Sequence, residues 1–309
     1  MTWVGWRLQR TETAIALGIV ALLAALLVPT GIDMANTYHQ YGLGSCLMAN
    51  PSQSCAARVG IFEQHFQTLI ALANWFTLIP GLIGVLLAAP FIFDLEHGTY
   101  RLMWTQGITR GRWLRSKLGL GALAALVASG ALVLLFTWWR SPQVSLDGRL
   151  DTGTYDTEGI VVIAYALFAF GFAVALGAVW RRAAASIAVA FVAYFALRVW
   201  VDYSLRNHLV SASTTTWTGP NQPSRLYDAV VLSQSVVIHG VRHVLGGGSF
   251  LGGHVQVAAG PALAHATFQA TYLPASDFWP LQLSEAGVFA GAALLLVAFA
   301  AWWTQRRVS

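Results

Sequence analysis

The chain alternates long apolar runs with shorter polar segments. Six runs are almost free of charged residues: residues 13–32, 68–93, 118–139, 159–180, 183–201 and 286–303. Each is close to or above the roughly 20 residues that a helix needs to cross about 30 Å of hydrocarbon. They are rich in Ala, Leu, Val and Gly and lack the alternating polar positions of a barrel strand. The pattern therefore predicts an all-α membrane protein with six transmembrane helices.

The polar segments between these runs predict the rest of the architecture. We expect residues 1–12, with two Trp and two Arg, to form a short helix lying in the membrane interface, the alternative being a disordered tail. The first span should end around Pro29. Residues 33–67 and 202–285 should form outer loops, and residues 94–117 a short polar connector. A single permease domain would then span residues 1–309.

Composition and charge support this topology and orient it. The chain is 56% hydrophobic and 10% charged, with a mean hydropathy of +0.59, which is too apolar for a soluble domain. Eleven basic and three acidic residues fall on the side of the termini and the connector, against seven basic and ten acidic residues on the other side. By the positive-inside rule, the termini and residues 94–117 should be cytosolic. Juxtamembrane bases facing anionic lipid also explain the pI of about 9.5 without nucleic-acid binding.

The two cysteines lie nine positions apart in the first outer segment. Cys46 and Cys55 flank Pro51 in a stretch rich in Gly, Ser and Pro. Outside the cytosol such a pair usually forms a disulfide. Metal binding would need more ligands, and His39 is the one histidine nearby.

The long segment 202–285 is too apolar for disorder. Apolar and polar positions over residues 226–245 predict an amphipathic helix lying on the outer membrane face or capping the bundle. Four histidines share the segment, and the first two have the i, i+4 spacing of a metal pair: His239, His243, His254 and His265. No zinc-hydrolase motif surrounds them, so we expect a solvated polar face and no metal site.

The sequence carries no catalytic motif. A phosphate-binding loop requires a Gly-Lys-Ser/Thr sequence, and the only lysine, Lys117, stands in Arg-Ser-Lys-Leu-Gly. Apart from Arg198, no predicted span contains an acidic, basic or histidine residue for intramembrane catalysis or for a proton relay. We therefore expect neither an enzyme nor an intrinsic ATPase.

Residues 89–119 contain the sequence Asp-Leu-Glu-His-Gly-Thr-Tyr-Arg-Leu-Met-Trp-Thr-Gln-Gly-Ile-Thr-Arg. This stretch closely resembles the loop between the second and third spans of ABC-2 type transporter permeases, in which Glu-x-Gly-Thr precedes a leucine-rich helix, a Ser/Thr-Arg turn and a lysine. Residues 3–10 and 155–182 resemble the actinobacterial branch of that family. Resemblance covers roughly residues 1–205 and the last span, and residues 205–280 match nothing familiar.

The resemblance implies a bacterial plasma-membrane subunit of an ABC exporter. Its partners would be a second permease copy, identical or related, membrane lipids, and a separate cytosolic ATPase that binds the ATP and Mg; this chain would hold no cofactor. The connector would contain the coupling helix, with Gly98 allowing a sharp turn and Thr99 capping the next helix. The expected coupling residues are Glu96, Gly98, Thr99, Arg101, Leu102, Met103, Trp104 and Arg110. A plain positive-inside anchor is the alternative, but it leaves Met103 and Trp104 unexplained.

The resemblance also suggests that the second and fifth spans line a transport path for an amphipathic or lipophilic cargo. The candidates are Asn74, Trp75, Phe76, Phe191, Tyr194 and Arg198. Each has a simpler explanation in helix packing, and Arg198 could pair with Asp202 or extend to the interface. Two other functions stay open: a non-transporting sensor or immunity protein that binds a peptide or antibiotic through its outer segment, and an unrecognised membrane enzyme.

Overall fold

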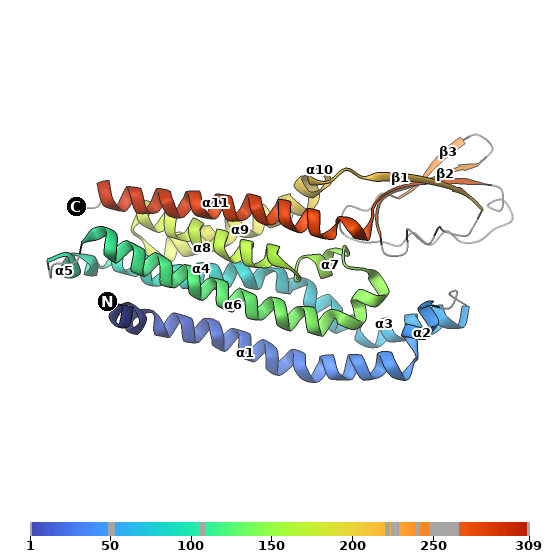
Figure 1. Ribbon diagram of the computed structural model, residues 1–309, viewed down its shortest axis with the longest axis horizontal. Helices are drawn as coiled ribbons and strands as arrows, with labels where there is room; N and C mark the ends of the chain where they lie inside the picture. The colour runs from blue at the N-terminus through green and yellow to red at the C-terminus, as the bar shows by residue number, and fades with distance from the viewer. Residues whose placement is uncertain are drawn as a thin grey trace. The chain divides into compact units, whose positions relative to one another are not determined.

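The structure is a computed structural model that describes residues 2–48, 53–105, 109–219, 229–238, 241–246 and 266–307, together with Pro223 and Leu226. The longer helices are α1 (Thr2–Gln40), α3 (Gln53–Ala73), α4 (Ile79–Glu96), α6 (Arg110–Asp147), α8 (Ile160–Trp180), α9 (Ala183–Trp200) and α11 (Phe278–Arg307) (Figure 1). The short helices are α2 (Leu43–Met48), η1 (Asn74–Leu78), α5 (Thr99–Thr105), α7 (Thr152–Tyr155), η2 (Val201–Leu205), α10 (Arg206–Leu209) and η5 (Ala275–Asp277). The strands are β1 (Ser213–Thr218), β2 (Val230–Ile238), β3 (Val241–Gly246) and β4 (Thr267–Leu273).

Six helical stretches of the described chain are long and apolar enough to cross a membrane. They begin at Thr13, Ser54, Arg110, Ile160, Ala183 and Ala275. The predicted number of spans is confirmed, but the predicted all-α class is not, because a four-stranded antiparallel sheet lies between the fifth and sixth spans. The chain is therefore a multi-pass membrane protein.

The chain divides into two compact units. The first comprises Met1–Trp139, Thr157–Leu197 and Ala286–Ser309, and the second comprises Arg140–Asp156 and Arg198–Glu285. The first unit is a helical bundle, and in it the ends of α1 and α11 nearest the chain termini lie at the same end of the bundle as α5 (Figure 1). The second unit contains the sheet.

The bundle is built around α4 and α8, which pack on each other over their lengths. In the most apolar 18-residue stretch of each span, 72% is buried in α8 but only 17% in α1. Helix α1 therefore presents most of its apolar surface outward, as a lipid-facing helix does. Close approach of α4 and α8 requires small residues, because a Cβ at Gly84 would collide with the carbonyl oxygen of Ala166.

The predicted interfacial helix of residues 1–12 is not separate, because α1 is continuous from Thr2 to Gln40. The prediction that this helix ends around Pro29 was also wrong. The hydroxyl of Thr30 donates to the carbonyl of Leu26 (2.9 Å) and receives a bond from the indole N–H of Trp139 (3.0 Å). These bonds support the backbone next to Pro29. At about 1.5 Å per residue, the 39-residue helix is also much longer than the hydrocarbon layer is thick.

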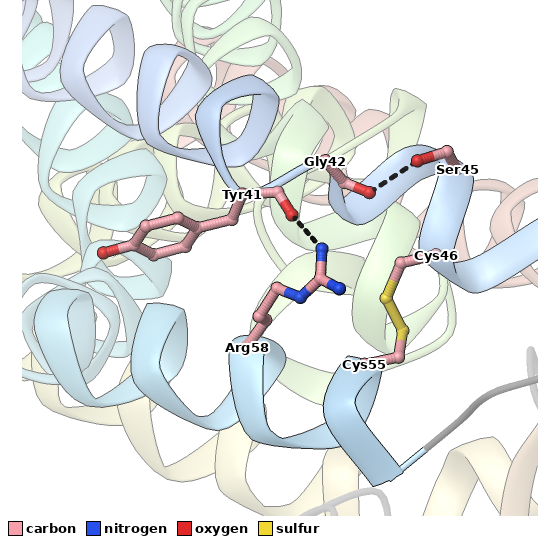
Figure 2. Close-up of a disulfide and its surroundings, with 6 residues drawn as sticks. All are labelled: Tyr41, Gly42, Ser45, Cys46, Cys55 and Arg58. Atoms are coloured by element: carbon pink, nitrogen blue, oxygen red, sulfur yellow. Dashed lines mark hydrogen bonds between the residues drawn. A yellow bond between two sulfur atoms is a disulfide. The ribbon is translucent and has the colours of Figure 1, made fainter.

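Residues 33–67, expected to form a loop, are mostly helical, because α1 extends into them and α2 and α3 follow. The Cys46–Cys55 disulfide predicted there is present and joins α2 to α3, with Cα atoms 5.7 Å apart (Figure 2). Arg58 on α3 donates to the carbonyl of Tyr41 (3.1 Å) beside it (Figure 2). The covalent link and this hydrogen bond fix the turn between α1 and α3.

The amphipathic helix predicted over residues 226–245 was wrong, because β2 and β3 occupy this stretch. The four strands form an antiparallel sheet in the order β1-β4-β2-β3. Valines dominate β2, and β-branched side chains fit a pleated surface better than a helix. Trp217 of β1 pairs with Phe268 of β4, and their rings stack with centroids 5.3 Å apart.

Candidate functional site

The connector, residues 94–117, begins with a sharp turn between α4 and α5. Helix α4 ends at Glu96, and Gly98 adopts a φ of +71°, which a residue with a side chain rarely adopts. Thr99 starts α5, but its hydroxyl donates to the carboxylate of Asp94 (2.9 Å). The Glu-x-Gly-Thr motif therefore builds the turn, with the threonine bonded back to the helix that precedes it.

Asp94 also pairs with the only lysine of the chain. The Lys117 ammonium lies 2.7 Å from the Asp94 carboxylate, with side-chain exposures of 4% and 18%. A charge this deeply buried needs a partner, because an unpaired buried ion loses its hydration without compensation. The pair joins the last turn of α4 to the first turns of α6.

Glu96 joins the same turn to a third helix. Its carboxylate accepts a hydrogen bond from the backbone N–H of Ala183 (3.0 Å), the first residue of α9. The first N–H groups of a helix have no partner within the helix, and a carboxylate there is stabilised by the helix dipole. Glu96 thus caps α9 from the end of α4.

Two further bonds tie the connector region to the last span. Arg110, the first residue of α6, donates to the carbonyl of Gln305 (3.2 Å), and Arg181 donates to the carbonyl of Arg307 (3.2 Å). Arg181 itself follows α8 in a left-handed conformation, with φ 53°. The ends of α4, α6, α8, α9 and α11 in the bundle are therefore linked within or beside the connector.

An aromatic cluster holds α5 against α6. Trp104 packs on Tyr100 (ring centroids 4.6 Å apart) and on Trp113 (6.0 Å), and the Arg110 guanidinium lies 4.4 Å from the Trp104 ring centre. Trp104 is half-buried within the chain, so the structure gives it a packing role where the sequence suggested an anchor for a partner.

The exposed side of α5 carries Leu102 and Arg101. Leu102 is 66% exposed, and the Arg101 side chain lies beside Tyr100, with Nε 3.4 Å from its hydroxyl. Met103 belongs to α5, but its side chain falls outside the described part of the structure. Among the described side chains of α5, Leu102 is the most exposed large apolar group.

The expected path residues separate into two groups. The rings of Phe76 and Phe136 pack with their centroids 5.2 Å apart. The hydroxyl of the buried Tyr194 donates to the carbonyl oxygen of Thr77, 3.1 Å away. These two contacts are helix packing. Asn74 and Trp75 on η1 are exposed, Trp75 by 64%.

Phe191 on α9 is half-buried. The structure therefore leaves Asn74, Trp75 and Phe191 as the predicted residues that can meet a cargo, a lipid or a second copy. The 3₁₀ segment η1, which interrupts the second span, is of the kind that often marks a hinge.

Arg198, the sixth expected path residue, belongs to a buried charge cluster of the second unit. It pairs with Asp156 (2.7 Å) and Asp202 (3.2 Å), and Arg206 and Glu285 complete the group. Pairing with Asp202 was one of the sequence alternatives. Asp156, Arg206 and Glu285 were missed, although Arg198, Asp202 and Arg206 recur every four residues and so share one helix face.

Of the four histidines considered for metal binding, His243 lies exposed on β3. The other three fall outside the described residues. Within the described ranges, no group of three or more His, Cys, Asp or Glu is placed to hold a metal ion.

A family model described as ABC-2 membrane transporter related matches residues 17–206. No curated protein and no solved structure matches the chain. The matched range includes the connector and ends at Arg206, so the sheet and α11 lie beyond it.

Proposed function

The chain belongs to the ABC-2 membrane transporter related family, and from that premise we propose that it is the membrane subunit of an ATP-driven exporter. Such subunits are typically non-catalytic permeases. Here a separate cytosolic ATPase would supply the ATP and Mg chemistry, and a second permease copy, identical or related, would complete the path. The resemblance of residues 3–10 and 155–182 favours the actinobacterial branch and a bacterial plasma membrane.

The observation that carries the proposal is the set of bonds by which the connector region is joined to four spans. Asp94–Lys117 joins α4 to α6, Glu96 caps α9, and Arg110 reaches the end of α11. A displacement of α5 would therefore reach four spans through bonds made by the chain segments on either side of it. The excess of basic residues on this side supports a cytosolic location, where an ATPase can dock.

The exposed side chains of α5 indicate where the ATPase would dock. Leu102 is a large, 66% exposed apolar side chain on α5, and removing its apolar surface from water would favour the binding of a partner. Arg101, exposed beside it, would add charge complementarity. Trp104 and Arg110 support this surface from behind by packing α5 on α6.

The exported cargo is proposed to be amphipathic or lipophilic, such as a drug, antibiotic, peptide or lipid. Trp75 and Asn74 on the broken second span and Phe191 on α9 offer an aromatic surface with one amide group. Such a surface suits a molecule with both apolar and hydrogen-bonding parts.

The docking role is tested with two matched truncations. The ATPase that co-purifies from the native host is co-expressed with Leu102→Ala or with Leu134→Ala, which removes a comparably exposed leucine from the middle of α6 (66% and 74% exposed). We expect Leu102→Ala to weaken ATPase retention at least about tenfold, the loss of roughly 1.4 kcal/mol, and Leu134→Ala to leave it unchanged. Equal retention by both variants would contradict the assignment of α5.

Transmission is tested separately at Glu96. Glu96→Ala should bind the ATPase normally but lose cargo-stimulated hydrolysis, because the cap on α9 is gone. Glu96→Gln can still accept the Ala183 N–H bond and should keep most of the stimulation. Glu63→Ala, which removes an exposed acid from α3, is the control.

The sensor or immunity alternative has one supporting observation, the four-stranded sheet between the fifth and sixth spans. It predicts that no nucleotide-hydrolysing subunit co-purifies from the native host in equal amount. It also predicts that deleting the ATPase gene leaves the protective phenotype intact.

A further inference from the structure

The second unit contains a compact group of charged residues that the proposed coupling role does not use. We call it the acid–arginine cluster; its members are Asp156, Arg198, Asp202, Arg206 and Glu285, with Tyr155 beside them. Asp156 follows α7, Arg198 lies in the last turn of α9, Asp202 lies in η2, Arg206 starts α10 and Glu285 lies on α11. Segments far apart in sequence therefore meet at one point.

Each arginine contacts all three acids. Arg198 lies 2.7 Å from Asp156, 3.2 Å from Asp202 and 3.5 Å from Glu285. Arg206 lies 2.9 Å from Asp202 and 3.1 Å from Glu285, and it also pairs with Asp156. The members thus form a network and not a set of separate pairs.

Local backbone geometry brings the two arginines onto one carboxylate. Arg198, Asp202 and Arg206 follow one another at intervals of four, and the turn between them, η2, is a π-helix. Short π segments inside helices are frequent at functional sites. The same oxygen of Asp202 is within 3.2 Å of both guanidinium groups.

The charges of the cluster do not balance. Three carboxyl groups face two guanidinium groups, and Arg206 and Glu285 are fully buried. Among the neighbouring groups, the Tyr155 hydroxyl donates to Glu285 of the cluster (3.0 Å), and the buried Arg140 donates to Thr154 (3.3 Å). A surplus negative charge in a buried site is costly, and the least expensive remedy is to bind a proton.

The carboxyl that takes this proton can be identified. Burial raises the pKa of Asp156, but Arg198 and Arg206 outweigh burial and hold this pKa below its ordinary value. For Asp202, burial and the neighbouring Asp156 raise the pKa to about 6 against the attraction of the same arginines. Burial also raises the pKa of Tyr155, so the phenol remains a donor. These directions, together with the single Asp202 oxygen that contacts both guanidinium groups, point to Asp202 as the carboxyl that binds the proton.

The position of the cluster along the chain indicates what the proton would control. Arg206 precedes β1 by seven residues, and Glu285 follows β4 by twelve. The two chain segments that enter and leave the sheet are therefore held together by the Arg206–Glu285 contact. We propose that the acid–arginine cluster is a proton-binding site whose occupied form clamps the sheet segment, residues 213–273, and whose empty form loosens it.

The sign of the effect follows from linkage. The folded cluster holds its proton up to a higher pH than the unfolded chain, so the clamp is strongest in acid and weakens as pH rises through about 6. Between pH 7.5 and pH 5, the closed form should gain about tenfold over the open form, because one proton binds selectively to it. The sheet segment would then respond to the acidity of the medium that it faces.

The test is hydrogen exchange of the full chain in lipid nanodiscs, read on the β1 and β4 amides and corrected for intrinsic rates. In the wild type we expect about tenfold more protection at pH 5 than at pH 7.5. Asp202→Asn mimics the protonated acid and should give high protection at both pH values. Asp33→Asn, which removes an exposed carboxylate from α1, should behave like the wild type.

Two results would overturn the proposal. One is wild-type protection that does not change with pH, and the other is an Asp202→Asn variant that keeps the wild-type pH dependence. If that variant cannot be produced, infrared difference spectra of the wild type between pH 7.5 and pH 5 replace it. A carbonyl band of a buried protonated carboxyl must then appear at pH 5, and its absence contradicts the proton site.

Discussion

The connector and the acid–arginine cluster use the same residue types in opposite ways. In the connector, each charge has one dedicated role: Lys117 pairs with Asp94, and Glu96 accepts from the N–H of Ala183. In the cluster, two arginines share three acids, and every acid contacts both arginines. The first arrangement is a chain of separate links, and the second is a network.

Burial explains why the two arrangements differ. Glu96 is exposed, so water can hydrate its carboxylate when the N–H of Ala183 moves away. Glu285 and Arg206 are fully buried, and no water replaces a lost partner there. In the proposed coupling role, the Glu96 link can therefore break and re-form, whereas the buried Lys117 keeps Asp94 paired. In the proposed proton site, the cluster changes state by gaining or losing a proton.

The largest stability effect is expected where the network loses an arginine. Arg206→Ala leaves Asp202 and the buried Asp156 and Glu285 around the single Arg198 and should destabilise the second unit by about 3–5 kcal/mol, the usual cost of breaking a buried ion pair. Thermal unfolding and the yield of folded protein measure it. Arg149→Ala, which removes an exposed arginine from the same unit, is the control and should change stability by less than about 0.5 kcal/mol.

A compensating substitution distinguishes a network from a pair. Removing one acid as well, as in Arg206→Ala with Glu285→Gln, still leaves the other two acids with one arginine, so stability should recover only in part. Full recovery would show that Arg206 and Glu285 act as an isolated pair and would contradict the network.

The connector should give a smaller effect that does recover. Lys117→Met leaves Asp94 without its cation and should cost about 2 kcal/mol, less than in the cluster because Asp94 is partly hydrated and also accepts from Thr99. Adding Asp94→Asn should restore at least half of that loss, since the pair is then replaced as a whole. A double-mutant cycle in thermal unfolding measures the coupling, and additive losses would refute the pairing.

The sequence predicted local features better than those that depend on distant segments. Six spans followed from apolar length, and the Cys46–Cys55 disulfide followed from spacing in a polar segment. The turn at Gly98 also followed from local chemistry, because its positive φ is a property of glycine. In each case the cause lies within a few residues of its effect.

The features that the sequence could not predict depend on contacts made after folding. Glu285 is one acid at the start of a span until α11 brings it to Arg206, and Trp104 looked like a free anchor until α6 covered it with Trp113. Residues 226–245 fitted a helical pattern, but pairing of β2 with β4 overrode it. Polar and apolar residues at spacings of three and four, as in residues 226–245, fit a helix, and pairing with a neighbouring strand can still make them a strand.

The smallest stability effect is expected at Glu96, and it tests most directly whether the connector link is weaker than the ion pairs of the cluster. Glu96→Ala removes a cap from α9 and should cost about 1 kcal/mol, whereas Glu96→Gln should cost about half as much because the amide oxygen still accepts from Ala183. Parallel thermal unfolding of both variants and of Glu63→Ala measures these steps. A loss above about 3 kcal/mol for Glu96→Ala would mean that breaking this connector link costs as much stability as breaking an ion pair of the cluster. A loss near 1 kcal/mol would leave Glu96 as a weak link, as the proposed coupling role requires of a bond that releases α9 and then re-forms.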